Sequence, residues 1–131
     1  KKVGIKFIKV SVIYFTIGVL LGMYMSMEHD YVLKGVHVHI SLLGWASFAL
    51  AGIIYYLFPK AGNHTLAKVH FWGANIGLPL MMGGLLTLLI SGSEQATVFI
   101  SLGTTLVVIS TILFAYNVLM NVRVPVVTLK E

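Results

Sequence analysis

Apolar residues in this chain occur in four long runs separated by short polar segments. The runs cover residues 7–27, 36–58, 69–91 and 97–120. Each is close to the roughly 20 residues that an α-helix needs to cross the apolar core of a bilayer. The pattern predicts an all-α membrane protein, with four transmembrane helices in one bundle and a single membrane domain over residues 1–131. The first run is too long, and too poor in small residues at its end, for a removable signal peptide, so we expect it to remain as a helix.

The positive charges predict how the bundle is oriented. Of all residues, 58% are hydrophobic and 10% are charged, and the net charge is +5. Basic residues precede the first run, lie between the second and third, and follow the fourth: Lys1, Lys2, Lys6, Lys9, Lys60, Lys68, Arg123 and Lys130. Cationic loops stay on the cytoplasmic side, so we expect both termini to be cytoplasmic. This topology explains the net charge, and we expect membrane lipid, not nucleic acid, as the partner.

Small residues mark two of the predicted helices. Gly18 and Gly22 have the GxxxG spacing, which predicts a groove for a neighbouring helix. The third run carries a set of small residues, namely Gly73, Ala74, Gly77, Gly83 and Gly84. These let another helix come close, or they leave room for a flat ring such as a porphyrin. The sequence leaves both interpretations open.

Five histidines and no cysteine limit the possible metal chemistry to His, Met and oxygen ligands. The predicted topology places His29, His37 and His39 near the outer face, and His64 and His70 near the cytoplasmic face. At the rise of an α-helix, the two groups are separated by roughly 25 Å in depth. We therefore expect that His39 and His70 of one chain cannot share one iron.

His37 and His39 lie two residues apart at the start of the second run. On a regular helix such residues point about 200° from each other, so they cannot both face one metal. One could ligate an iron that lies against the bundle, while the other faces a second site, a neighbouring subunit or headgroup water. Ionisable residues inside a membrane are costly and usually functional, which favours a site over two interfacial rings.

Two further groups of residues are weaker candidates. Met23, Met25, Met27 and His29 carry thioether and imidazole ligands that suit Cu(I). Alternate spacing aligns such ligands on an extended segment but scatters them around a helix. His70 lies beside Phe71 and Trp72, which suits an aromatic belt at the membrane interface. With Asn75 and the nearby glycines, His70 could instead line a ligand pocket.

The segment HISLLGWASFALAGIIYYLFP, residues 39–59, resembles the second transmembrane helix of haem-copper oxidase catalytic subunits. It is most similar to the nitric oxide reductase large subunit and the C-family oxidases, with about one residue of slippage around Gly44. The matching residues are His39, Ser41, Leu42, Leu43, Trp45, Gly52, Tyr55, Tyr56 and Pro59. The resemblance implies that His39 is an axial ligand of a low-spin haem b near the outer face.

The first ninety residues or so also resemble small stand-alone proteins described as subunit-I-like. These have an HxHxxLLGW helix followed by an LAxxHFW helix, matched here by His37, His39, Trp45, His70, Phe71 and Trp72. The chain lacks the later helices that supply the other low-spin ligand and the binuclear centre of a full catalytic subunit. The resemblance therefore implies haem binding, and it leaves open whether the chain is an enzyme.

A haem at His39 needs a second axial position. His29 could fold back from the loop, His37 could reach across a subunit interface, or the position could stay open for water or a gas. Lys34 could pair with the haem propionates. We thus expect a membrane haem b protein of the bacterial inner (cytoplasmic) membrane, active in electron transfer or diatomic gas binding. We expect a homo-oligomer with an unidentified redox partner; a copper-handling accessory protein is the alternative.

Overall fold

The computed structural model describes residues 1–124 and confirms the all-α prediction. Its helical segments are α1 (Lys2–Glu28), α2 (Lys34–His39), η1 (Ile40–Ser47), α3 (Phe48–Leu57), α4 (Pro59–Gly62), α5 (Thr65–Ser91) and α6 (Ala96–Asn121). Because α2, η1 and α3 form one continuous span, four helices are long and apolar enough to cross a membrane. The four spans agree with the four apolar runs, although α1 and α5 begin earlier than hydropathy predicted.

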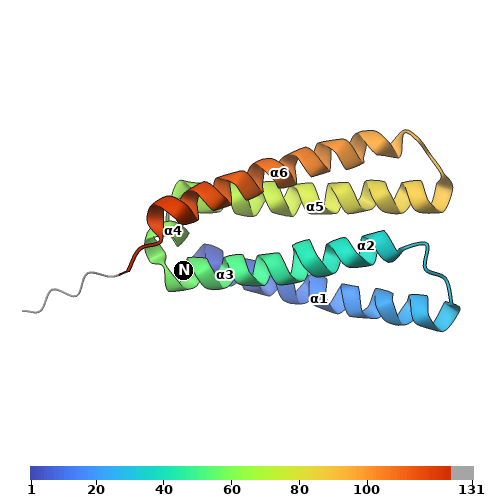
Figure 1. The fold of residues 1–131 in the computed structure, drawn as a ribbon, viewed down its shortest axis with the longest axis horizontal. Helices are drawn as coiled ribbons and strands as arrows, with labels where there is room; N and C mark the ends of the chain where they lie inside the picture. The colour runs from blue at the N-terminus through green and yellow to red at the C-terminus, as the bar shows by residue number, and fades with distance from the viewer. Residues whose placement is uncertain (125–131) are drawn as a thin grey trace, which may run out of the picture.

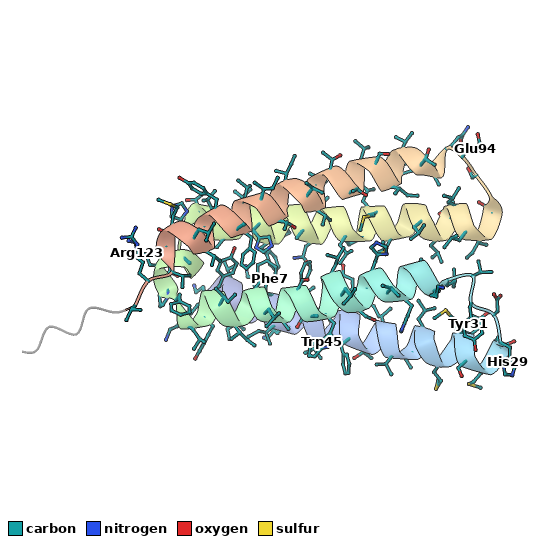
Figure 2. All side chains as sticks on the ribbon, viewed as in Figure 1. Phe7, His29, Tyr31, Trp45, Glu94 and Arg123 are labelled. Carbon is teal, nitrogen blue, oxygen red and sulfur yellow. The ribbon has the colours of Figure 1, made fainter. Side chains whose placement is uncertain are left out.

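The four spans form two antiparallel hairpins that lie side by side (Figure 1). One hairpin joins α1 to the continuous α2, η1 and α3 span, and the other joins α5 to α6. The N-terminus and the end of α6 lie at the same end of the bundle. Arg123 lies at this end, whereas His29, Tyr31 and Glu94 lie at the opposite end (Figure 2). The charge separation expected from the sequence is thus present between the two ends; Lys130 lies outside the described residues.

Backbone geometry explains where the hairpins turn. The residue that follows α1, His29, adopts the left-handed conformation with φ 49°, and the residue that follows α5, Gly92, does so with φ 66°. Glycine adopts this conformation at little cost, whereas His29 does so as a single residue after the helix. Between the hairpins, Pro59 occupies the first position of α4, where a missing N–H costs nothing.

Helices α5 and α6 approach through their glycines. A Cβ atom added to Gly77 would lie 2.9 Å from the carbonyl oxygen of Gly103, and one added to Gly84 would lie 2.9 Å from the backbone nitrogen of Ile100. The small residues of α5 therefore allow a close helix contact. Of the two interpretations left open by the sequence, this one holds for Gly73, Gly77 and Gly84, whereas Gly83 has no neighbour within 4 Å.

Helix α1 packs on its partner span in the same way. A Cβ atom on Gly4 would lie 2.7 Å from the carbonyl oxygen of Gly52 on α3. Further along, the groove at Gly18 and Gly22 holds the side chains of Ser41 and His37. The GxxxG spacing is thus a packing groove, as predicted, and one of its occupants is a candidate site residue.

An aromatic core connects the two hairpins. Phe7 of α1 is fully buried, and its ring lies 5.3 Å from Phe48, 4.7 Å from His70 and 5.1 Å from Phe71, measured between ring centroids. Figure 2 shows Phe7 between the hairpins. Large apolar side chains elsewhere are exposed on the outer faces, where a bilayer would cover them.

A second connection lies at the end that holds the termini. Asn117 of α6 is fully buried, and its amide donates a hydrogen bond to the carbonyl oxygen of Ala61 in α4 (3.1 Å). The Asn121 amide donates to the side-chain oxygen of Asn117 at 2.7 Å. These bonds satisfy a polar group that would otherwise be costly to bury.

The middle of the second span is a π-helix, η1. Such segments are rare and occur frequently at functional sites. The Ser47 hydroxyl donates to the carbonyl oxygen of Leu42, five residues earlier, at 2.8 Å. Gly44 in this segment lies against the Tyr14 ring, since a Cβ atom there would be 2.7 Å from the Cβ of Tyr14. A wider turn changes the relative direction of the faces before and after it, here those of α2 and α3.

Candidate functional site

His37 packs into its own chain. Its Nδ1 lies 2.8 Å from the carbonyl oxygen of Gly18, and a Cβ atom on Gly22 would lie 3.0 Å from its Cε1. Because a carbonyl only accepts hydrogen bonds, Nδ1 carries the proton and donates. The structure thus places this ring in the α1 groove of its own chain.

His39 faces the other hairpin. Its Nδ1 donates to the carbonyl oxygen of Gly35 at 2.7 Å, so Nε2 of the neutral ring keeps its lone pair. The side chain lines a groove of about 360 Å³ between the hairpins, here called the His39 groove. Its other lining residues are Leu43, Met81, Thr104, Val107, Val108, Thr111 and Ile112. His37 and His39 therefore point to different neighbours, as the helix geometry predicted.

The His39 groove contains a second possible metal ligand that sequence reasoning missed. Met81 of α5 lines the groove and is almost fully buried, and the Thr104 hydroxyl donates to its sulfur at 3.0 Å. This hydrogen bond fixes the thioether but leaves one sulfur lone pair. A thioether with an imidazole is a known axial pair for haem iron. Met81 lies 42 positions after His39 in the sequence, and no local motif connects the two.

The structure does not bring the other predicted outer-face residues to the groove. His29 is exposed at the turn after α1, and Figure 2 shows it at the far tip of the molecule. Lys34 is exposed at the first position of α2. Trp45 contacts Phe15 of α1, with ring centroids 4.6 Å apart, and so lies toward the opposite face of the span.

The methionines proposed for copper belong to α1 and do not share a face. Met25 is 5% exposed, whereas Met23 and Met27 are 55% and 70% exposed. Within residues 1–124, no group of three or more His, Cys, Asp or Glu side chains is arranged to hold a metal ion. The three methionine side chains thus point in different directions around a helix, and this arrangement disfavours the copper interpretation.

His70 lines a second space, here called the His70 cavity. The cavity has a volume of about 290 Å³ and is bordered mainly by apolar side chains of both hairpins. The His70 ring stacks on Phe114 with centroids 4.8 Å apart, and its Nδ1 lies 2.9 Å from the Tyr55 hydroxyl. Trp72 is exposed, as an aromatic belt requires, whereas His70 is buried and does not fit that interpretation.

The two spaces are neighbours between the hairpins. Leu43, Val107 and Thr111 line both of them, but His39 borders one and His70 the other. Asn75 lines neither space, and its amide donates to the carbonyl oxygen of Phe71. His64 caps α5, since its Nδ1 accepts a hydrogen bond from the backbone N–H of Leu66.

No protein-family model, curated protein or solved structure matches this chain. The resemblance of residues 39–59 to an oxidase helix therefore remains an expectation, and the candidate site depends on the geometry alone.

The position of His37 leads to a first testable prediction. His37→Leu removes the hydrogen bond to Gly18, and we expect the free energy of unfolding to fall by about 1 kcal/mol. Haem content is expected to stay unchanged. The measurement is unfolding by dodecyl sulfate in mixed micelles, with Val38→Leu, at an exposed position beside His37, as the control. Equal losses in the two variants would contradict the structural role of His37.

Proposed function

We propose that this chain is a membrane haem b protein in which His39 supplies an axial ligand. The observation that carries the proposal is the state of the His39 ring. Its Nδ1 donates to the Gly35 carbonyl, and its side chain lines a groove between the hairpins. In metal-binding histidines, the N–H of the other ring nitrogen almost always donates a hydrogen bond to such an acceptor. This bond fixes the tautomer and leaves Nε2 for the metal.

The rest of the groove suits a porphyrin. Leu43, Val107 and Ile112 give an apolar lining, and Met81 offers a thioether in the same groove. Lys34 lies five residues before His39 at the end of the bundle and is free of the core, so it could reach propionates. The absence of cysteine from the sequence excludes a thiolate ligand. When bound, haem supplies reversible one-electron chemistry and a site for gas ligands.

The occupancy of the second axial position separates the two modes of action. With Met81 as the second ligand, iron has no open position and electron transfer is favoured. With the position open, binding of a diatomic gas is favoured. Because His39 is exposed in the single chain, we also propose that a second copy covers the groove in a homo-oligomer. We place the protein in the bacterial inner membrane, with its lysine-rich end in the cytoplasm.

The test is an optical spectrum of the detergent-purified protein after expression with ample haem. The wild-type chain is expected to show Soret and alpha bands, and His39→Ala is expected to lose them. His64→Ala, in an exposed histidine that caps α5, is the matched control and should keep them. Bands that are absent from the wild type, or unchanged in His39→Ala, would refute the proposal.

Met81 gives a separate prediction within the same experiment. Met81→Leu conserves volume and apolar character, so haem should remain bound. If Met81 is the second ligand, carbon monoxide should shift the Soret band of Met81→Leu at much lower concentrations than that of the wild type. Equal carbon monoxide affinity in the two proteins would mean that Met81 does not bind the iron in the wild type. The open ligand position would then favour gas binding over electron transfer.

A further inference from the structure

The His70 cavity is lined by both hairpins and is mainly apolar. Its lining includes Phe48 and Ala51 of α3, Ala74 and Leu78 of α5, and Phe114 of α6. The lining hydroxyls are those of Ser47 and Thr111, and they donate to the carbonyl oxygens of Leu42 and Val107. Among the side chains that line the cavity in residues 1–124, His70 therefore supplies the hydrogen-bond donor that is not already used.

Packing holds the His70 ring in one orientation. The side chain is 6% exposed, lies between Phe7 and Phe114, and meets Tyr55 at its Nδ1. Tyr55 is itself 0% exposed, and its hydroxyl meets both His70 Nδ1 and the side chain of Asn117. The Asn117 oxygen accepts from Asn121, and its amide has a second N–H that can donate to the phenol oxygen, so the phenol proton is donated to His70 Nδ1.

This direction determines the tautomer of His70. If Nδ1 accepts from Tyr55, the neutral ring carries its proton on Nε2. His70 thus has the opposite tautomer to His39, whose Nδ1 donates to Gly35. His39 offers a lone pair that suits a metal, whereas His70 offers an N–H that does not. The two histidines between the hairpins are therefore suited to different ligands.

The Nε2–H of His70 is accessible from the cavity. Among residues 1–124, no side-chain nitrogen or oxygen is both fully buried and without a hydrogen bond. The bond of His70 is made by Nδ1, so the unpaired Nε2 must have accessible surface, and the ring lines the cavity. A donor at the wall of an apolar space recognises a hydrogen-bond acceptor on an apolar molecule.

We propose that the His70 cavity binds a planar, lipid-soluble carbonyl compound, with a quinone or aryl ketone oxygen accepting a hydrogen bond from His70 Nε2–H. The volume of about 290 Å³ is at the lower end for ligand pockets and suits one small ring system. A carbonyl is a strong acceptor that carries no charge, so it can enter from the membrane. The site is separate from the proposed haem ligand and does not depend on it.

The experiment compares menadione, a naphthoquinone, with 2-methylnaphthalene, which has the same ring system without carbonyl groups. Binding to the full chain in lipid nanodiscs is measured by equilibrium dialysis, and uptake by empty nanodiscs is subtracted. The chain contains no cysteine, so menadione cannot form a thiol adduct. We expect one menadione per chain, bound about tenfold more tightly than the hydrocarbon.

Variants distinguish a specific site from partition into lipid. In His70→Phe the tenfold preference should fall to about one, because the donor is lost. Ala74→Leu keeps His70 but fills the cavity, so it should weaken the binding of both compounds. His39 borders the His39 groove and not the His70 cavity. His39→Ala should therefore leave the preference for menadione intact, even if it removes haem. A preference that persists in His70→Phe, or is absent from the wild type, would overturn the proposal.

A spectroscopic measurement tests the hydrogen bond directly. In protein labelled with ¹⁵N-histidine, the His70 Nε2 resonance is assigned by its absence from His70→Phe. It should have the shift of a protonated ring nitrogen and should move when menadione is added but not when 2-methylnaphthalene is added. An Nε2 resonance without a proton, or one that saturating menadione leaves in place, would also overturn the proposal.

Discussion

Gly103→Ala is expected to destabilise the α5 and α6 hairpin by about 2 kcal/mol. The added methyl group would lie 2.6 Å from the carbonyl oxygen of Gly77 and 2.8 Å from the Cα of Met81. Both are backbone atoms, so no side-chain rotation can relieve the contact, and the helices must separate. The expected loss is a net value, since alanine alone favours a helix over glycine by about 1 kcal/mol. The measurement is unfolding by dodecyl sulfate in mixed micelles.

Gly83→Ala is the matched control for this prediction. Gly83 lies on the same hairpin, but a Cβ atom there has no neighbour within 4 Å. The substitution should be neutral or should stabilise the chain by up to about 1 kcal/mol. If Gly103→Ala is as harmless as Gly83→Ala, helices α5 and α6 are not in close contact. Because Met81 lies at this contact, Gly103→Ala should also lower haem content.

The second large effect is expected in the other hairpin, from Gly52→Ala. The new methyl group would lie 2.8 Å from both the Gly4 carbonyl oxygen and the Ile8 Cγ1, at the crossing of α1 and α3. Ile8 can rotate but the carbonyl cannot, so we again expect a loss of about 2 kcal/mol. Phe7 lies between Gly4 and Ile8 on α1, so the substitution should displace it. This displacement should weaken the near-ultraviolet circular dichroism of the aromatic core.

Gly35→Ala controls for this second substitution. The Cβ atom there would meet only the Leu85 Cδ2 at 3.7 Å, an ordinary contact. The variant should keep wild-type stability within about 0.5 kcal/mol, and its carbonyl should still accept the hydrogen bond from His39. Equal stability of Gly52→Ala and Gly35→Ala would contradict the crossing geometry.

Hydropathy predicted the four spans because a bilayer imposes one requirement, about twenty apolar residues, on every spanning helix. The direction of His37 relative to His39 was also predictable, since it follows from helix geometry over two residues. Hydropathy did not predict where α1 and α5 begin. Lys2 and Lys6 belong to α1 although they are charged, because a helix can continue beyond the apolar core.

The partners of the candidate residues could not be predicted from the sequence. Met81 joins the His39 groove only because Gly77 and Gly103 let α5 and α6 pack closely, and nothing in the sequence near His39 indicates this. The tautomer of His70 depends on Tyr55, which lies 15 residues away on another span. The resemblance of residues 39–59 to an oxidase helix did not predict the π-helix η1. The one-residue slippage in that resemblance falls around Gly44, which lies within η1.

The hydrogen bond from Asn117 to Ala61 has a consequence for biosynthesis. It joins the short turn between the hairpins to the last of the four spans. When only the first three spans have been made, the Ala61 carbonyl still lacks this partner, and α5 is joined to the first hairpin by α4 and by the packing around Phe7. Addition of α6 completes the junction, so the relative position of the hairpins becomes fixed only after the first three spans have been made.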